Sequence, residues 1–489
     1  MNIALRVDSS NKVGIGHLHR CLTLAKELNK KNKIFFISRK LKNNENNLVP
    51  PLGFKLNKIN GLKKETSSKK NLEYDKQQTI KIIKTNNIKL LIVDNYEIDY
   101  NWEKTISKYC KILLIHDFLE RKSYCDYFLN YHFLKENFFL KKKLKKNCKL
   151  LIGNQYAIIK KNFFTKKRVE RKSIFIYLGS VDSSEITESS LNELIKNKYK
   201  EQINVVLGNQ NQNKKKILKK FNKYKNIKFF KPNKKNLYNY TSKSNLIISG
   251  AGISMYENII NNSNMIVFNK NKIHKSITLN LKKISNVKFA NNKDELKKLI
   301  KKEIDNKINK NYLKNKRSVL PIVDSHGVTR ITNIINGLKN NSFYLRKAKL
   351  KDIFFLYFLK NDSINRKSAF NQNYVTLTNH IKWFKTKSSQ KKFLIFIFKN
   401  KENYIGQVTF KFVNINTCKI DYAISNEFRG NGYSKIMLQK AFGHINKKTV
   451  IAEVKNNNIA SKKIFNFLKF HLVNKNKNRL LFRKTILND

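Results

Sequence analysis

Short apolar runs that alternate with helical patterns constrain the fold of this chain more than any other feature. The runs lie at 2–7, 33–39, 88–94, 111–117, 173–179, 203–208, 227–230, 245–250 and 265–268. Such runs are typical of strands buried on both faces of a parallel sheet, with the helices between them as crossovers. A polar stretch around 160–172 divides the series. The sequence therefore predicts an α/β fold with two Rossmann-like domains, at 1–160 and 161–340.

The pattern changes after residues 335–342. A strand and a helix are expected at 343–362, and residues 391–413 predict an antiparallel hairpin with its turn at 399–403. We therefore expect a third domain, of the α+β class, at 341–489.

The chain is strongly basic, with a formal net charge of +69 at pH 7. Such a charge is typical of nucleic-acid-binding proteins. However, only 13 of the 102 basic residues are arginine, the side chain best suited to bidentate recognition of bases and phosphates. The lysines are spread along the whole chain among many Asn and Ile residues. We interpret the charge as a solvated lysine surface and expect no specific nucleic-acid partner, although non-specific binding to polyanions at low salt stays open.

Other features indicate the compartment. No apolar run is long enough to cross a bilayer, and the N-terminus lacks the shape of a signal peptide. The five cysteines are widely spaced, odd in number and without a CxxC pair, which favours reduced thiols over disulfides or a zinc site. We therefore expect a cytoplasmic protein without a membrane partner and without a metal.

The segment "VGIGHLHRC" at 13–21 places a histidine where a strand should pass into a helix. Gly14 and Gly16 let the backbone turn sharply and approach a ligand, and free N–H groups at a helix start suit an anion. A dinucleotide fingerprint would need a third glycine where His19 stands, so that interpretation fails. His17 is then either a general base or a histidine that only caps or packs the helix, and the loop pattern alone leaves both open.

The first 335 residues resemble the UDP-sugar hydrolases of pseudaminic acid biosynthesis. The resemblance rests on "LRVDSSNKVGIGHLHRC", "VDNYEIDYNWE", "IHDFLER", "IGNQYAII", "YLGSVD", "SGAGISMYE" and "VDSHGVTR", which follow in this order. It implies that a water activated by His17 attacks the anomeric carbon and releases UDP without an essential metal. It also implies that substrate contacts come from Arg6, Asp8, Gly14, Gly16, Arg20 and Tyr96. His116 and Ser180 depart from the family pattern.

A second glycine segment, "SGAGISMYE" at 249–257, follows an apolar run and leads into a helix. Gly250 and Gly252 can admit a phosphate to backbone N–H groups, next to Ser254. Glu257 could accept hydrogen bonds from ribose hydroxyls. The alternative is a packing turn with a solvent-facing glutamate. The segment resembles the UDP site of glycosyltransferases of the GT-B type, which favours the binding interpretation.

Residues 420–442 combine a strand, a glycine loop and an amphipathic helix. The loop resembles motif A of the GNAT acetyltransferases, in which it holds the diphosphate of coenzyme A. This implies that acetyl-CoA is bound by Arg429, Gly430, Asn431, Gly432, Tyr433 and Ser434. Residues 450–470 resemble the next GNAT block, which adds Asn458 and Ser461. Phe465 stands where many members carry a tyrosine that protonates the leaving thiolate.

Glu453 is our candidate for the base that accepts the amine proton during acetyl transfer, although it could equally be an ordinary exposed strand glutamate. The two resemblances together predict a bifunctional enzyme. It would N-acetylate the 4-amine of a UDP-4-amino-4,6-dideoxy-N-acetyl-altrosamine and then hydrolyse UDP from UDP-2,4-diacetamido-2,4,6-trideoxy-beta-L-altropyranose. Three alternatives remain open. One is a GT-B glycosyltransferase with an accessory acetyltransferase, the second is an enzyme of a related nonulosonic acid pathway, and the third is a polyanion-binding protein.

Overall fold

The chain forms two compact units, and each is described by itself. The computed structural model describes residues 1–487 except for 11–14, 61–67, 118–120, 133–142, 161–172, 183–184, 233, 260–263, 271–273, 276–277, 279–286, 309–322, 324–325, 338–342, 402 and 446–447. The first unit comprises Met1–Lys135 and Lys141–Thr332, and the second is formed mainly by Asn333–Asp489. No helix in these described residues is long and apolar enough to cross a membrane.

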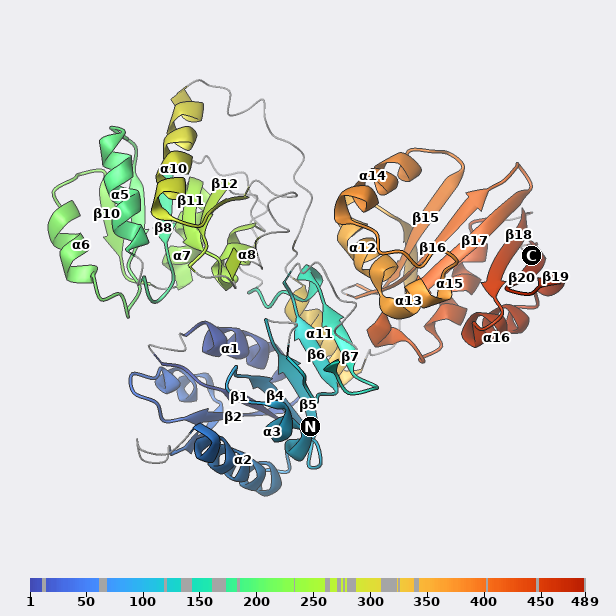
Figure 1. Cartoon of the computed structure of the whole chain (residues 1–489), viewed down its shortest axis with the longest axis horizontal. Coiled ribbons are helices and arrows are strands. Elements are labelled where there is room, and N and C mark those ends of the chain that lie inside the picture. The colour runs from blue at the N-terminus through green and yellow to red at the C-terminus, as the bar shows by residue number, and fades with distance from the viewer. Residues whose placement is uncertain are drawn as a thin grey trace. The chain divides into compact units, whose positions relative to one another are not determined.

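The first unit begins with a seven-stranded sheet in the order β3-β2-β1-β4-β5-β6-β7, in which every pair is parallel. Its strands are β1 (Asn2–Val7), β2 (Lys33–Arg39), β3 (Lys55–Ile59), β4 (Leu90–Asp94), β5 (Lys111–Ile115), β6 (Tyr127–Asn130) and β7 (Lys149–Ile152). Its helices include α1 (Gly16–Leu28), α2 (Ser68–Thr85) and α3 (Tyr100–Ile106). Helix α1 covers one face, and α2 and α3 cover the other (Figure 1). The strand order reverses at β1, which is where open parallel sheets bind ligands.

A second parallel sheet follows in the same unit, in the order β10-β9-β8-β11-β12-β13. Its strands are β8 (Ser173–Tyr177), β9 (Ile203–Val206), β10 (Ile227–Phe230), β11 (Ser244–Gly250), β12 (Asn264–Phe268) and β13 (Val287–Ala290). The helices described here are α5 (Ile186–Lys196), α6 (Lys214–Phe221), α7 (Lys234–Lys243), α8 (Ile253–Ile259), α10 (Lys293–Ile308) and α11 (Gly327–Asn336). The prediction of two parallel α/β sheets is confirmed. Their boundary, predicted at 160, lies between β7 and β8.

The second unit is built on a mixed sheet in the order β14-β15-β16-β17-β18-β20-β19. Its strands are β14 (Tyr344–Lys347), β15 (Phe393–Lys399), β16 (Tyr404–Phe412), β17 (Thr417–Ile424), β18 (Lys448–Lys455), β19 (His471–Asn476) and β20 (Arg479–Ile486). Its helices are α12 (Ile353–Asn361), α13 (Ser363–Ser368), α14 (Leu377–Ser388), α15 (Tyr433–Phe442) and α16 (Ile459–Phe467). Strands β15 and β16 form the predicted antiparallel hairpin.

In the sheet of the second unit, the neighbouring strands β17 and β18 separate part-way along their length. Strands β17 and β18 pair in parallel only from Thr417 with Thr449 to Ile420 with Ala452. Both strands continue beyond this point, so Asp421 on β17 and Glu453 on β18 are the first residues past the split. Past this point the backbone N–H and C=O groups of the two strands no longer bond to each other. They need other hydrogen-bond partners, which an extended ligand can supply. The split therefore makes an opening through the middle of the sheet.

Candidate active sites

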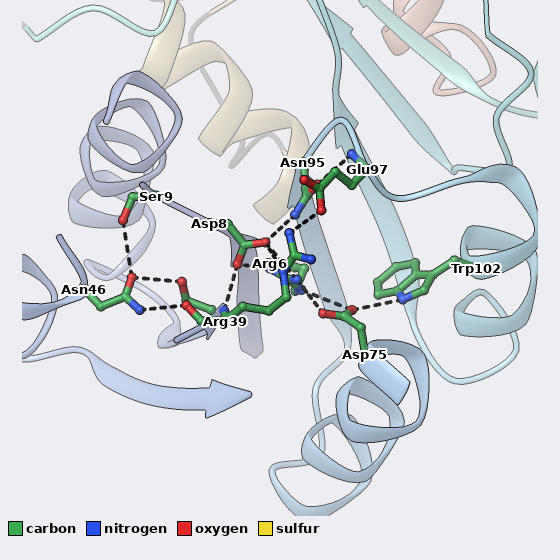
Figure 2. Close-up of polar contacts among 10 residues, drawn as sticks. Arg6, Asp8, Ser9, Arg39, Asn46, Asp75, Asn95, Glu97 and Trp102 are labelled. Atoms are coloured by element: carbon green, nitrogen blue, oxygen red, sulfur yellow. Dashed lines mark hydrogen bonds and ion pairs between the residues drawn. The ribbon is translucent and has the colours of Figure 1, made fainter. Parts of the chain in front are cut away.

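A buried network of charged side chains lies at the carboxyl ends of β1, β2 and β4 (Figure 2). The Arg6 guanidinium lies between two carboxylates, with Nη1 2.7 Å from Asp8 Oδ1 and Nη2 2.5 Å from Asp75 Oδ2. Arg39 Nε donates to Asp8 Oδ2 at 2.8 Å. Burial opposes the ionisation of Asp8, but Arg6 and Arg39 outweigh it and lower the pKa of Asp8 to about 2. Asp8 is therefore ionised at neutral pH.

Arg6 and Asp8 were predicted to contact substrate, but each is only 1 % exposed. Asn95 Nδ2 donates to Asp8 Oδ2 at 2.7 Å, and its own Oδ1 accepts from the backbone N–H of Glu97 at 2.8 Å. The network thus fixes the turn that presents Tyr96. We assign Arg6 and Asp8 to the support of the site, because their side chains do not reach its surface.

His17 lies in the first turn of α1, and its ring is held by the carboxylate at the end of β4. Its Nδ1 lies 2.6 Å from Asp94 Oδ1. Arg20 also approaches this nitrogen, with Nη2 at 3.1 Å, but a guanidinium can only donate, and the same Nη2 has Asp94 Oδ1 at 2.5 Å. We therefore assign the proton to Nδ1, directed at Asp94, which makes Nε2 the acceptor nitrogen of the ring.

Arg20 joins two buried carboxylates. Its Nε donates to Asp94 Oδ2 at 2.5 Å, and its Nη1 donates to Asp117 Oδ1 at 2.9 Å. Burial alone would raise the pKa of both acids. However, Arg20, together with His17 at Asp94 and His132 at Asp117, lowers them, and the pKa of Asp117 falls well below its ordinary value. Arg20 therefore fixes the positions of the two carboxylates, Asp94 and Asp117, in the site.

Tyr96 closes this group of residues. Its hydroxyl donates to Asp117 Oδ2, and its ring meets that of His17 edge to face at 4.7 Å between centroids. Burial and the neighbouring Asp117 raise its pKa, so the hydroxyl stays protonated and can act only as a donor or a neutral acceptor. Gly16 has open space where a Cβ would stand, and Gly14 lies outside the described residues. The structure thus brings His17, Arg20 and Tyr96 together.

Sequence reasoning missed two residues that extend this group. His132 Nε2 lies 3.1 Å from Asp117 Oδ1, and His132 Nδ1 lies 2.9 Å from the hydroxyl of Tyr256 on α8. Both side chains are buried. Neither is marked by a glycine loop or a spacing rule, although Tyr256 lies within the segment "SGAGISMYE" that was singled out. The contact connects the His17 group to the second sheet.

The second glycine segment lies at the end of β11 and the start of α8. Gly252 faces open space, while Gly250 has the carbonyl oxygen of Leu178 3.6 Å from an added Cβ. Ser254 is half-buried and Glu257 is buried, so Glu257 is not the solvent-facing glutamate of the alternative interpretation. Burial raises the pKa of Glu257 to about 7, with a weaker opposing attraction from Lys160. A carboxyl group of this kind can donate or accept hydrogen bonds near neutral pH.

The second unit contains a cleft of about 590 Å³ that passes through the parted strands. The glycine loop and the start of α15 line one part of it, with Gly430 at φ +78° and Gly432 at φ +75°, in the left-handed region. Among the residues that the structure describes, no atom lies within 4 Å of the Cβ position of either glycine. Ser434 in the first turn of α15 also lines the cleft. This arrangement of N–H groups fits the diphosphate of acetyl-CoA.

Several predicted cofactor residues are engaged by the protein itself. Arg429 Nη2 donates to Asp362 Oδ1 at 2.6 Å, and Asn431 Nδ2 donates to the carbonyl oxygen of Phe428 at 3.1 Å. Asn458 caps α16 by accepting from the N–H of Ser461 at 3.1 Å. The Tyr433 ring packs on Phe343 and Phe428. We assign these four residues to the shape of the cradle, and three of them, Arg429, Tyr433 and Asn458, also line the cleft beside the two glycines and Ser434.

Two carboxylates face the cleft where the strands part. Glu453 is paired with two cations, with Oε1 2.5 Å from Lys419 Nζ and Oε2 3.2 Å from Arg479 Nη1. Asp421 receives a 3.4 Å hydrogen bond from Gln407 Nε2. Asp421 is accessible through the cleft, yet the protein packed around it raises its pKa. Asp421 was missed because an aspartate in an alternating strand carries no motif.

The Phe465 ring is buried in the core and stacks on Phe482 at 5.8 Å between centroids. Tyr422 meets the same ring edge to face at 5.9 Å, and its hydroxyl lies 3.1 Å from Ser461 Oγ. Tyr422, Ser461 and Phe465 all line the cleft. This side of the cleft therefore carries a phenolic hydroxyl even though position 465 lacks one.

Comparison with known proteins identifies both parts of the chain. Residues 343–471 match the family model of the acetyltransferase (GNAT) domain. An uncharacterized protein of Methanocaldococcus jannaschii is 26% identical over 506 aligned positions, which cover 96% of each protein. UDP-2,4-diacetamido-2,4,6-trideoxy-beta-L-altropyranose hydrolase of Campylobacter jejuni is 27% identical over 54% of this chain and 90% of its own length. The chain is a fusion of a hydrolase-like N-terminal half with a GNAT domain.

Solved structures similar to this chain include spermidine N-acetyltransferase from Vibrio cholerae in complex with CoA and spermine. It is 15% identical, covers 30% of this chain and 97% of its own, and has a TM-score of 0.29. Among the residues that the structure describes, no group of three or more His, Cys, Asp or Glu side chains is placed to hold a metal ion.

We predict that Glu257→Gln changes stability only at higher pH. Because the folded state resists ionisation of Glu257, the wild type loses stability as the pH rises from the ordinary value of 4.5 to about 7. The variant should be more stable by up to about 3 kcal/mol at pH 8 and equal to the wild type at pH 4. This difference in the free energy of unfolding is measured by denaturant unfolding, with hydrogen exchange in β11 and α8 as the local probe.

The matched control for Glu257→Gln is Glu193→Gln on α5, a half-exposed glutamate in the same domain. It should show no such pH-dependent gain. Destabilisation of Glu257→Gln at pH 8, or an equal gain at pH 4 and pH 8, would contradict a buried and protonatable Glu257.

Proposed function

We propose that this chain is a cytoplasmic bifunctional enzyme that uses a UDP-linked amino sugar and acetyl-CoA. The GNAT domain N-acetylates the 4-amine of a UDP-4-amino-4,6-dideoxy-N-acetyl-altrosamine. The N-terminal half, with a GT-B arrangement of its two sheets, hydrolyses UDP from the resulting UDP-2,4-diacetamido-2,4,6-trideoxy-beta-L-altropyranose. The observation that carries the proposal is the contact of His17 Nδ1 with Asp94, which makes Nε2 the acceptor nitrogen, in a chain that also contains an acetyltransferase cleft.

In the hydrolytic step, His17 Nε2 accepts a proton from a water molecule whose oxygen attacks the anomeric carbon. The bond between that carbon and the phosphate oxygen breaks, and UDP leaves with the electron pair. Asp94 stabilises the imidazolium that forms, because its carboxylate accepts the hydrogen bond that Nδ1–H donates. Gly250, Gly252, Ser254 and Glu257 are our candidates to hold the UDP group.

In the acetyl-transfer step, the neutral amine attacks the thioester carbonyl, the carbon–sulfur bond breaks and coenzyme A leaves as the thiolate, which takes a proton from water. A base must accept one amine proton. We favour Asp421 over Glu453, because both carboxylate oxygens of Glu453 are engaged by cations, one by Lys419 and the other by Arg479. Burial also raises the pKa of Asp421, which makes its carboxylate a stronger base than that of an ordinary aspartate.

We expect His17→Ala to lower the rate of UDP release by at least about 10²-fold, the lower end for a positioned general base. Acetyl transfer by the same protein should be unchanged, because the His17 group and the cleft belong to separate compact units. A coupled assay for free UDP and a thiol assay for coenzyme A measure the two reactions.

His19→Ala, on the same helix, is the control for loss of an imidazole near the loop. If UDP release persists in His17→Ala at the wild-type rate, His17 has no part in the mechanism. If neither the wild type nor His19→Ala releases UDP from the diacetamido substrate, the hydrolytic function itself is wrong.

We predict that Asp421→Asn lowers kcat for acetyl transfer by about 10²-fold or more while acetyl-CoA still binds. In the wild type, kcat should fall at low pH as Asp421 takes up a proton. Because the pKa of Asp421 is raised, this fall should begin above the pH at which an ordinary aspartate titrates. Initial rates of thiol release from pH 5 to pH 9 measure the profile.

Glu453→Gln provides the comparison, since it removes the other carboxylate at the same split in the sheet. It should keep the acid limb of the pH profile. The opposite outcome, with Glu453→Gln inactive and Asp421→Asn active, would return the role of base to Glu453.

A further inference from the structure

In the second unit, one face of the sheet is open over its C-terminal strands. Register pairs Ile451 with Arg483 and Glu453 with Leu481, so these side chains share a face with Lys419, which pairs with Ile451. The opposite face carries residues of the core, among them Val450, Ala452, Phe465 on α16 and Phe482. The polar face of β17, β18 and β20 is therefore not the face that packs on α16.

This face is hollowed into a groove of about 280 Å³. Its lining includes Lys419, Arg479, Asn474 and Asn476, with Ile451 on its apolar part. Lys419 and Arg479 are about half exposed, at 48% and 50% of their side chains. The groove thus offers one ammonium, one guanidinium and two amides to a ligand that enters from solvent.

The charges in the groove do not cancel. Glu453 contacts both cations, so one carboxylate balances two positive charges. An anion that binds between Lys419 and Arg479 would meet a net positive charge. Guanidinium and ammonium groups are the side chains that best recognise phosphate oxygens, the first by a fork of donors and the second as a point charge.

The groove lies next to the acetyltransferase cleft, because Glu453 lines both. Asp421 lies next to Glu453 where β17 and β18 part, on the same face of the sheet. A ligand whose amine lies at Asp421 can therefore extend over Glu453 into the groove. The glycine cradle for the cofactor lies elsewhere, at the start of α15.

We propose that this groove binds the phosphate groups of a nucleotide-linked acceptor of the acetyl group, with Lys419 and Arg479 as its phosphate-binding residues. The proposal rests on the proposed acetyl transfer to a nucleotide-linked amine. It assigns the acceptor a binding site in the second unit that is separate from the nucleotide site of the hydrolase-like half.

The test uses the full chain with Lys419→Gln, Arg479→Gln and the double variant. Two acceptors are compared by initial rates of thiol release: the UDP-linked 4-amino sugar and the same amino sugar without UDP. We expect KM for the UDP-linked acceptor to rise by at least 10-fold in the double variant. KM for the nucleotide-free acceptor should change less than twofold, with KM for acetyl-CoA unchanged. Lys440→Gln, an exposed lysine on α15, controls for the lost charge.

An equal rise in KM for both acceptors would overturn the proposal, because the groove would then not recognise phosphate. A rise in KM for acetyl-CoA alone would assign the groove to the cofactor and would also overturn it. Wild-type kinetics in the double variant would also overturn the proposal, because the groove would then be only a solvated surface. A wild-type chain that acetylates the free amino sugar but is inert towards the UDP-linked one would overturn the proposed function and this proposal together.

Discussion

The hydrolase-like site is arranged around a carboxylate that has no exposure to water. An unpaired charge in the position of Asp94 would cost several kcal/mol, so the fold must supply partners. Arg20 supplies two donors and His17 a third. The guanidinium of Arg20, itself buried, requires the second carboxylate of Asp117, which in turn engages Tyr96 and His132. The orientation of the proposed catalytic imidazole thus follows from the need to compensate buried charge.

A different constraint shapes the acetyltransferase cleft. Strands β17 and β18 stop pairing after Ile420 and Ala452, and the opening gives the cleft access to both faces of the sheet. Asp421 faces one side and Tyr422, next in sequence, faces the other, beside Phe465. The alternation of side chains along one strand therefore provides a carboxylate towards the acceptor groove and a hydroxyl towards the core face.

The sequence predicted the buried strands well, because continuous apolar runs allow few other structures. Strands β1, β2 and β10 have the predicted bounds, and β4 is two residues shorter than predicted. Strands β3, β6, β7 and β13 were missed. The first of these, β3, is polar and lies at a sheet edge. Motifs located the His17 loop and the glycine cradle. They did not reveal that Arg6, Asp8 and Arg429 are engaged by protein partners, or that Asp421, His132 and Tyr256 lie beside the candidate site residues, because such contacts join residues far apart in the chain.

The central claim is that one chain acetylates a nucleotide-linked amine and then removes the nucleotide. It is tested most directly by mass spectrometry of a time course with the full chain, acetyl-CoA and the UDP-linked 4-amino sugar. The account predicts that the UDP-linked sugar first gains one acetyl group and that free UDP and the free diacetamido sugar then appear in equal amounts. Accumulation of the acetylated UDP-sugar, with UDP released only after a sugar acceptor is added, would contradict the account and would indicate a glycosyltransferase instead.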